Sequence, residues 1–157
     1  MTLVGLISDT HGLMRPQALD ALRDCSHIVH AGDIGDAAVI EALRAIAPVT
    51  AGRGNNDTTA WARNLPTHAT LNIDGVTLHV VHDIADVASD GAASAAQVVV
   101  SGHSHKPSVA MRGDTLYVNP GSAGPRRFRL PISLALLEVR GGAATARIVD
   151  LAPPVAH

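Results

Sequence analysis

The sequence predicts an α/β fold, and three observations support this prediction. The first half of the chain alternates short apolar runs with helical patterns, and the second half holds strand-forming runs separated by hairpin turns. In addition, 46% of the 157 residues are hydrophobic. Alternating strands and helices give a parallel sheet with right-handed crossovers. A chain of this size can bury one core, so we expect a single domain over residues 1–157.

Strands and helices alternate in the first half. Thr2 to Ser8 is an apolar run that predicts a buried strand, and Pro16 opens a helix because proline is favoured at the first helical position. The apolar residues of this helix fall on one face: Ala18, Leu19, Leu22 and Cys25. His27 to Ala31 predicts the second strand, and a second helical face follows at Val39, Ile40, Leu43 and Ile46. A third strand at Val49 to Ala51 completes a βαβαβ unit.

Turn dipeptides mark three hairpins in the second half: Asp74-Gly75, Gly113-Asp114 and Gly141-Gly142. We therefore expect a second sheet that is mostly antiparallel. Gln97 to Ser101 predicts a short buried strand, and the Ala-rich segment before it is compatible with a helix. The simplest packing places the two sheets together with helices outside. The Pro-rich stretch from Ala152 to Val155 is expected to be a frayed end.

The composition argues against several classes of protein. The longest apolar stretches, such as Ser133 to Val139, are far shorter than the roughly 20 residues that a membrane-spanning helix needs. The N-terminus lacks the basic region of a signal peptide and reaches Asp9 early, so we expect a cytoplasmic protein. With Cys25 as the only cysteine, no intrachain disulfide can form. A net charge of -2, no basic run, and only one Trp, one Tyr and one Phe argue against stable nucleic-acid binding.

Five polar clusters directly follow predicted strands. They are Asp9-Thr10-His11, Gly32-Asp33, Gly54-Asn55-Asn56-Asp57, His82-Asp83 and Gly102-His103-Ser104-His105. Ligands bind outside the carboxyl ends of strands in open α/β sheets, so we expect these clusters to converge. Carboxylate, amide and imidazole ligands together suit Mn, Fe, Zn, Co or Ni. A two-metal site needs a carboxylate shared by both ions, and Asp33, on a Gly-Asp turn, is the candidate bridge.

The order D-x-H, G-D, G-N-x-D, H and G-H-x-H resembles that of the calcineurin-like metallophosphoesterases, from Val4 to about Arg127. Four longer segments resemble the small bacterial and archaeal phosphodiesterase branch: His30-Ala31-Gly32-Asp33, Arg53-Gly54-Asn55, Gly102-His103-Ser104-His105-Lys106-Pro107 and Asn119-Pro120-Gly121-Ser122. This resemblance implies a four-layer α/β/β/α sandwich. It also implies the metal ligands, which are Asp9, His11, Asp33 and His105 for one ion and Asp33, Asn55, His82 and His103 for the other.

The resemblance further implies a dinuclear phosphoesterase in which a hydroxide bridging the ions attacks phosphorus in line. A small-molecule phosphodiester is the favoured substrate, and manganese is the first choice of metal, with Fe, Zn, Ni and Co as alternatives. The candidate catalytic residues are Asn55, Asn56, His82 and Arg53. Arg53 would donate charge-assisted hydrogen bonds to the phosphate, and Asn56 could donate to a nonbridging oxygen.

Two departures from the family pattern concern catalysis. Asn56 stands where the larger family often has a histidine proposed to protonate the leaving group, and an amide cannot act as an acid at neutral pH. Asp83-Ile84 follows His82 where the small branch usually has Gly-His. The alternatives are a phosphomonoesterase or pyrophosphatase with the same site, or a weakly active metal-binding scaffold, since a retromer subunit with this fold is a scaffold. A homo-oligomer is compatible with the sequence.

Other polar residues have structural explanations. Isolated histidines are more often structural than ligands, which applies to His27, His68, His79 and His157. His30 could orient a metal ligand or simply pack in its strand. Turn formation alone could explain Gly121 and Ser122, and solvation alone could explain Arg126 and Arg127. Asp9 and Asp33 are not expected to be helix N-caps, because neither immediately precedes a helical pattern.

Overall fold

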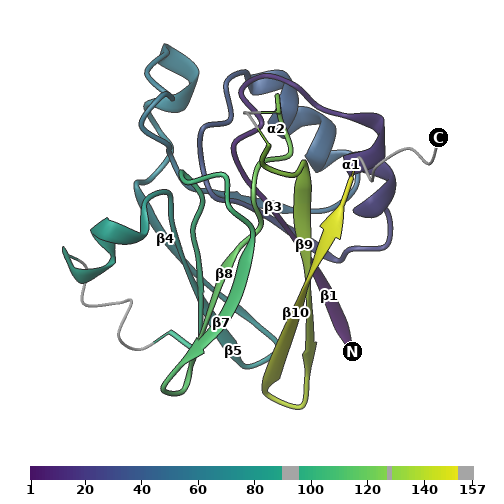
Figure 1. Cartoon of the computed structure of the whole chain (residues 1–157), viewed down its shortest axis with the longest axis vertical. Coiled ribbons are helices and arrows are strands. Elements are labelled where there is room, and N and C mark those ends of the chain that lie inside the picture. The colour runs from purple at the N-terminus through teal and green to yellow at the C-terminus, as the bar shows by residue number, and fades with distance from the viewer. Residues whose placement is uncertain (90–95, 127–128, 152–157) are drawn as a thin grey trace.

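Two five-stranded sheets form the framework of the computed structural model, which describes residues 1–89, 96–126 and 129–151 (Figure 1). The first half contains β1 (Thr2–Ile7), α1 (Pro16–Ala21), β2 (His27–His30), α2 (Ala37–Arg44), β3 (Val49–Ala51), η1 (Ala60–Ala62) and β4 (His68–Ile73). The second half contains β5 (Val76–Val81), η2 (Ile84–Ser89), β6 (Val98–Val100), β7 (Ser108–Arg112), β8 (Thr115–Asn119), β9 (Ser133–Arg140) and β10 (Ala143–Asp150).

The first sheet confirms the predicted βαβαβ unit. Its strand order is β10-β9-β1-β2-β3, with β1, β2 and β3 parallel. The predicted hairpin at Gly141-Gly142 joins β9 to β10, but it lies in this sheet and not in the second sheet where the sequence placed it, because β9 pairs antiparallel with β1 in the register Gly5↔Leu136. The N-terminal and C-terminal strands of the chain therefore share one sheet.

The second sheet is more parallel than the sequence predicted. Its order is β4-β5-β6-β8-β7, and the hairpins at Asp74-Gly75 and Gly113-Asp114 supply only the two antiparallel edge pairs. At the centre, β5, β6 and β8 run parallel. Hairpin signals identify strands that are neighbours in the sequence, whereas β6 reaches its partners through crossover connections. Its three fully buried valines are typical of a central parallel strand.

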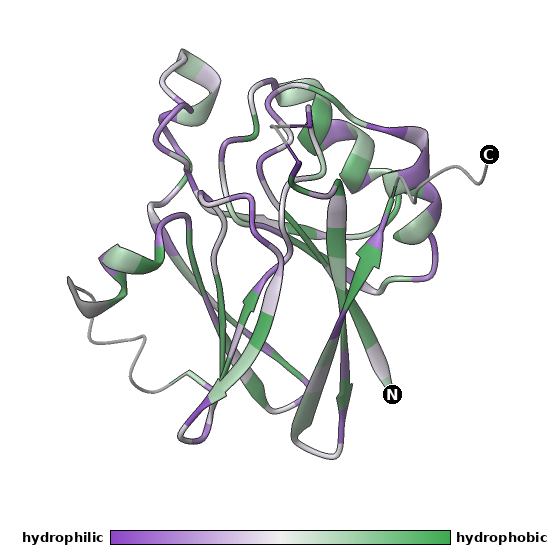
Figure 2. Cartoon of the chain, in the orientation of Figure 1, coloured by the Kyte–Doolittle hydropathy of each residue, from purple (hydrophilic) through white to green (hydrophobic). Residues whose placement is uncertain are grey.

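The sheets and helices stack in layers, as the four-layer prediction requires. A core between the sheets contains Val4, Leu78 and Val100, and a second core lies between the first sheet and helices α1 and α2. Figure 2 shows the hydrophobic residues gathered in the strands. The outer face of the second sheet carries a smaller cluster around Val81 and Val99, which Val87 of η2 partly covers. The Ala-rich segment before Gln97 and the tail from Ala152 fall largely outside the described residues.

The helices are short, and α1 ends earlier than its apolar face suggests. Its helical bonds stop at Ala21, and Leu22 acts as the C-cap while still packing fully buried against the core. Asp36 caps α2 by accepting a hydrogen bond from the Ala38 N–H at 3.0 Å, so neither Asp9 nor Asp33 is a helix N-cap. Among the described helices, none has the length and apolar character needed to cross a bilayer.

Candidate metal centre

Six polar side chains converge where four strands end. Asp9 and His11 follow β1, and Asp33 follows β2; His82 follows β5, while His103 and His105 follow β6. They form two groups: Asp9, His11 and His105, and Asp33, His82 and His103. Within each group the possible ligand atoms lie within 4.8 Å of one another. Strand ends thus bring together residues almost a hundred positions apart in the sequence.

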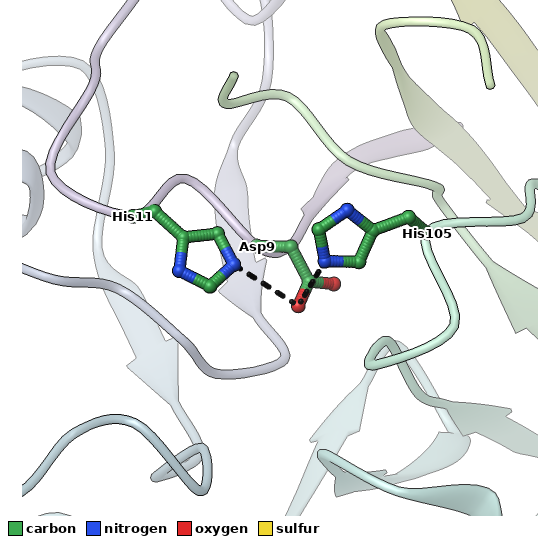
Figure 3. A group of neighbouring side chains, drawn as sticks. All are labelled: Asp9, His11 and His105. Atoms are coloured by element: carbon green, nitrogen blue, oxygen red, sulfur yellow. Dashed lines mark ion pairs between the residues drawn. The ribbon is translucent and has the colours of Figure 1, made fainter. Parts of the chain in front are cut away.

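Asp9 is held so that one carboxylate oxygen faces three imidazoles, including that of His82, whose Nε2 lies 3.8 Å away. Its Oδ1 lies 3.4 Å from His105 Nε2 and 3.9 Å from His11 Nε2 (Figure 3). Its Oδ2 accepts hydrogen bonds from the Ser8 hydroxyl at 2.8 Å and the His103 backbone N–H at 3.1 Å. Because Oδ2 is satisfied by protein donors, Oδ1 is left to face the histidines.

Asp33 lies between the two groups. Its Oδ2 is 3.8 Å from His11 Nε2 in the first group and 3.2 Å from His82 Nε2 in the second. The Nδ1 of His82 is 2.8 Å from the Ala31 carbonyl, which can only accept, so Nδ1 carries the proton and Nε2 presents its lone pair to the site. Asp33 is therefore placed where a bridging carboxylate would stand.

Electrostatics favour charge on this pair despite its burial. Burial alone would raise the pKa of the Asp33 carboxyl, but the nearby His82 and the Asn56 backbone N–H hold that pKa below its ordinary value. Burial opposes charge on His82 too, yet Asp33 and, more weakly, Asp9 raise its pKa. Without a metal ion, the raised pKa favours a second proton, on His82 Nε2, that pairs with Asp33 Oδ2; metal binding at Nε2 would displace this proton.

The arrangement fits divalent metal ions. Metal–ligand bonds of about 2.0–2.2 Å place two ligand atoms of one ion roughly 3 to 3.5 Å apart, near the separations found here. Asp9 Oδ1, His11 Nε2 and His82 Nε2 are buried and have no hydrogen-bond partner among the described residues. Buried polar atoms are rarely left so, and metal ions held by the two groups would satisfy all three. Carboxylate and imidazole donors select transition metals over Mg or Ca.

Backbone conformation sets the site apart from the rest of the chain. Outside glycine, positive φ angles occur among the described residues at Asp9 (56°), His11 (46°), Asp33 (54°), Asp74 (47°), His103 (72°) and His105 (63°). Asp74 is in a hairpin turn, and the other five belong to the two groups. Left-handed residues cost conformational energy that surrounding structure must hold, and they cluster at functional sites. Here the Asp9 N–H bonds the Gly32 carbonyl at 3.0 Å and the His11 N–H bonds the Asp33 carbonyl at 2.9 Å, which ties the strand ends together.

The Gly54-Asn55-Asn56-Asp57 segment organises Asp33. Asn56 donates from its backbone N–H to Asp33 Oδ1 and from Nδ2 to Asp33 Oδ2, both at 2.9 Å. The buried Asp57 carboxylate accepts backbone N–H bonds from Ile34 at 2.9 Å, Gly35 at 3.1 Å and Gly54 at 2.9 Å. A Cβ at Gly54 would lie 2.1 Å from the Asp33 nitrogen, so only glycine fits. Asp57 is a site residue without a predicted role, although its place in the G-N-x-D pattern is a signal for one.

His30 is a buried support beneath the site. The Gly32 N–H donates to His30 Nδ1 at 3.0 Å, which leaves Nε2–H to donate to Thr10 Oγ1 at 3.0 Å. The Thr10 hydroxyl in turn donates to the Ile34 carbonyl at 2.8 Å. Burial lowers the pKa of His30 to about 3, so the ring is neutral. This chain of bonds joins the loop after β1 to the loop after β2.

The Asn119-Pro120-Gly121-Ser122 segment also supports the site. Ser122 Oγ donates to the Asp9 carbonyl at 3.0 Å, and Asn119 Nδ2 donates to the Gly102 carbonyl at 3.1 Å. A Cβ at Gly102 would lie 2.0 Å from Ser8 Oγ, which explains glycine beside His103. Ser122 is therefore more than a turn residue. The isolated His27 instead contacts Thr50 Oγ1 at 2.8 Å, as a structural histidine would.

A pocket of about 530 Å³ opens beside the second group. The expected residues Arg53 and Asn55 line it together with His82 and His103, and Asn55 is exposed there. His68, interpreted from the sequence as a structural histidine, also lines the pocket, as do Arg63, Thr67 and Asp86, for which the sequence predicts no role. Asp83 Oδ2 lies 3.8 Å from His103 Nε2, and Ile84, 40% exposed, begins η2. Arg126 is exposed, and Arg127 and His157 lie outside the described residues.

Known proteins share both the sequence pattern and the fold. Residues 2–142 match the family model of the calcineurin-like phosphoesterase superfamily domain. A probable metallophosphoesterase of Methanothermobacter thermautotrophicus is 32% identical over 98% of this chain and 95% of its own. A solved archaeal phosphodiesterase has 21% identity and a TM-score of 0.77 over 94% of this chain and 100% of its own. Vps29 from Entamoeba histolytica, solved in complex with Zn²⁺, has 22% identity and a TM-score of 0.73 over 96% of this chain and 100% of its own.

Proposed function

Because the chain belongs to the calcineurin-like phosphoesterase superfamily, we propose that its metal centre holds two divalent ions and hydrolyses phosphodiesters. The observation that carries the proposal of two ions is the position of Asp33. Its Oδ2 lies 3.8 Å from His11 Nε2 and 3.2 Å from His82 Nε2, one nitrogen of each ligand group, which supports a bridging role. Asp9 Oδ1 also faces both groups, but its partner oxygen Oδ2 is bound by the Ser8 hydroxyl and the His103 N–H. The proposed ligands are Asp9, His11, Asp33 and His105 for one ion and Asp33, Asn55, His82 and His103 for the other.

The bound ions would activate water and neutralise charge on the phosphate. The residues of the chain prepare the site for this chemistry. The Ala31 carbonyl orients His82, and the Ser8 hydroxyl and His103 N–H orient Asp9. Arg53, at the pocket wall beside Asn55, would bind a nonbridging phosphate oxygen. The Asn56 amide donates to Asp33 in this structure, so we propose that it positions the bridge. Manganese remains the first choice of metal, with Fe, Zn, Ni and Co as alternatives.

The preference for diesters rests on the motif resemblance to the small phosphodiesterase branch. A phosphomonoesterase or pyrophosphatase could use the same ligands. The alternative of a metal-binding scaffold is supported by the likeness to Vps29, which shares the fold and is solved in complex with Zn²⁺. Turnover by the metal-loaded protein separates these functions.

The test is a metal-titrated assay with bis(4-nitrophenyl) phosphate and 4-nitrophenyl phosphate, with metal content measured on the same samples. We expect the diester to be hydrolysed faster, in proportion to bound metal, and Asp33→Ala to abolish turnover. Faster hydrolysis of the monoester would support the monoesterase. Full metal occupancy without turnover of either compound would support the scaffold.

A further inference from the structure

The pocket beside the metal centre lies between two segments that carry short helices. One wall comes from residues 53–63, which end in η1, and the facing wall comes from residues 82–86, which lead into η2. In Figure 1 these helices are the two unlabelled coils on the left side of the molecule. Asn55, His82 and His103 belong to both the pocket and the proposed ligand set, so the pocket is continuous with the metal centre.

The first wall carries two guanidinium groups that the protein leaves available. Arg53 is half-buried next to Asn55, and Arg63 is exposed at the C-cap of η1. In the described part of the chain, neither guanidinium forms an ion pair or a side-chain hydrogen bond. The acidic residues Asp83 and Asp86 stand on the facing wall, and Asp83 already lies 3.8 Å from His103. The two arginines are therefore free to bind an anion from outside.

The size and chemistry of the pocket indicate the kind of group that it takes. About 530 Å³ is the volume of a site for a whole small molecule and exceeds what one phosphate needs. No Phe, Tyr or Trp is among the described lining residues, and the cationic groups on the first wall are the two guanidinium groups. The ions and Arg53 suffice for the scissile phosphate. Arg63, ten positions further along the chain, is available for a second acidic group.

We propose that this pocket binds a second anionic group of the substrate, a carboxylate or a further phosphate, through Arg63, while Arg53 binds the scissile phosphate. The substrate class is then a phosphate ester with an acidic substituent. The inference rests on the proposed function in placing the scissile phosphate on the metal centre. Guanidinium suits the role because its planar donors bind carboxylate or phosphate oxygens in pairs.

The test measures binding of phosphonates, which resist hydrolysis, to the metal-loaded protein by calorimetry. The matched pair is 3-phosphonopropionate and propylphosphonate, which differ by a carboxylate in place of a methyl group; 1,2-ethylenediphosphonate offers a second phosphate analogue instead. We expect at least one of the two probes with a second acidic group to bind about tenfold more tightly than propylphosphonate. In Arg63→Gln this preference should fall to about twofold, and Arg63→Lys should retain part of it because the charge remains. Arg23→Gln is the matched control, since Arg23 lies on the surface paired with Asp20 at 3.2 Å.

Equal affinity of the three probes for the wild type, or a preference that survives in Arg63→Gln, would overturn the inference. Failure of all probes to bind would overturn it as well. If the preference for a second acidic group is present and depends on Arg63 but no phosphodiester is turned over, the proposed function fails while the anion-binding pocket stands. Whichever of 3-phosphonopropionate and 1,2-ethylenediphosphonate binds more tightly identifies the second group as carboxylate or phosphate.

Discussion

Asn56 donates hydrogen bonds to both oxygens of the Asp33 carboxylate, from its backbone N–H to Oδ1 and from its Nδ2 to Oδ2, each at 2.9 Å. The residue that stands where many family members have a histidine thus acts here on the proposed bridge. Truncation to Asn56→Ala removes one of the two bonds and leaves Asp33 freer to rotate. We expect metal affinity to fall about 10- to 100-fold, as for other residues that orient a ligand. Titration of manganese by calorimetry measures this, with the exposed Asn64→Ala as control; unchanged affinity would contradict the role.

The same residue predicts how the reaction depends on the leaving group. No acid stands at position 56, so charge on the departing oxygen must be carried by the leaving group or by solvent. We expect kcat for a series of aryl phosphodiesters to fall steeply as the leaving-group pKa rises. Asn56→His should flatten that dependence at equal metal content. A wild-type rate insensitive to leaving-group pKa, with chemistry rate-limiting, would reveal an acid elsewhere in the site.

Asp57 holds the loops of Asp33 and Asn55 together through three backbone N–H groups. In Asp57→Asn one oxygen becomes an NH₂ group, which cannot accept, so at least one buried donor loses its partner. The expected cost is roughly 2 to 3 kcal/mol of unfolding free energy, and metal binding should weaken as well. Urea unfolding in the presence of a chelator measures the cost. Asp114→Asn, in the exposed β7–β8 turn, should change stability little; a similar loss in both variants would argue against the role of Asp57.

His30 predicts a pH dependence of stability. Its pKa falls from 6.5 to about 3 in the folded protein, because burial disfavours the charged ring. Between these values the unfolded chain binds a proton that the folded protein does not, so stability is lost as the pH falls below 6.5. At pH 5 this residue alone lowers the free energy of unfolding by about 2 kcal/mol. The free energy of unfolding, measured with a chelator present at pH 7 and pH 5, should depend less on pH in His30→Gln than in the wild type. An equal change in unfolding free energy between pH 7 and pH 5 in the two proteins would contradict a lowered pKa of His30.

The sequence predicted the parallel strands of the first sheet and the strand-end positions of the candidate ligands, because both depend on local signals, but it did not predict that the Gly141-Gly142 hairpin joins the first sheet. Apolar periodicity locates β1, β2 and the helices, and polar residues that follow strands mark the strand ends. The centre of the second sheet was not predictable in this way, since β6 pairs through crossovers that leave no turn signal. Arg63 and Asp86 could not be identified either. They reach the pocket only because η1 and η2 project on either side of it, which depends on tertiary structure.

The positive backbone angles show a further limit of sequence reasoning. Asp and His tolerate left-handed conformations better than most residues, but nothing in the local pattern at His11 or His105 demands them. These angles follow from hydrogen bonds between loops that are distant in the sequence, such as the bond from the Ser122 hydroxyl to the Asp9 carbonyl. Ser122 was therefore compatible with a simple turn until the fold placed it against Asp9.

The central claim is that Asp33 bridges two metal ions, and metal stoichiometry tests it most directly. Protein reconstituted with manganese and freed of excess metal should contain two ions per chain by elemental analysis. Asp33→Ala should lose both ions, because it removes a ligand of each and the negative charge between them. His11→Ala should lose chiefly one ion, with the other held by Asp33, His82 and His103. One ion per chain in the wild type, or two ions retained in Asp33→Ala, would contradict the bridged centre.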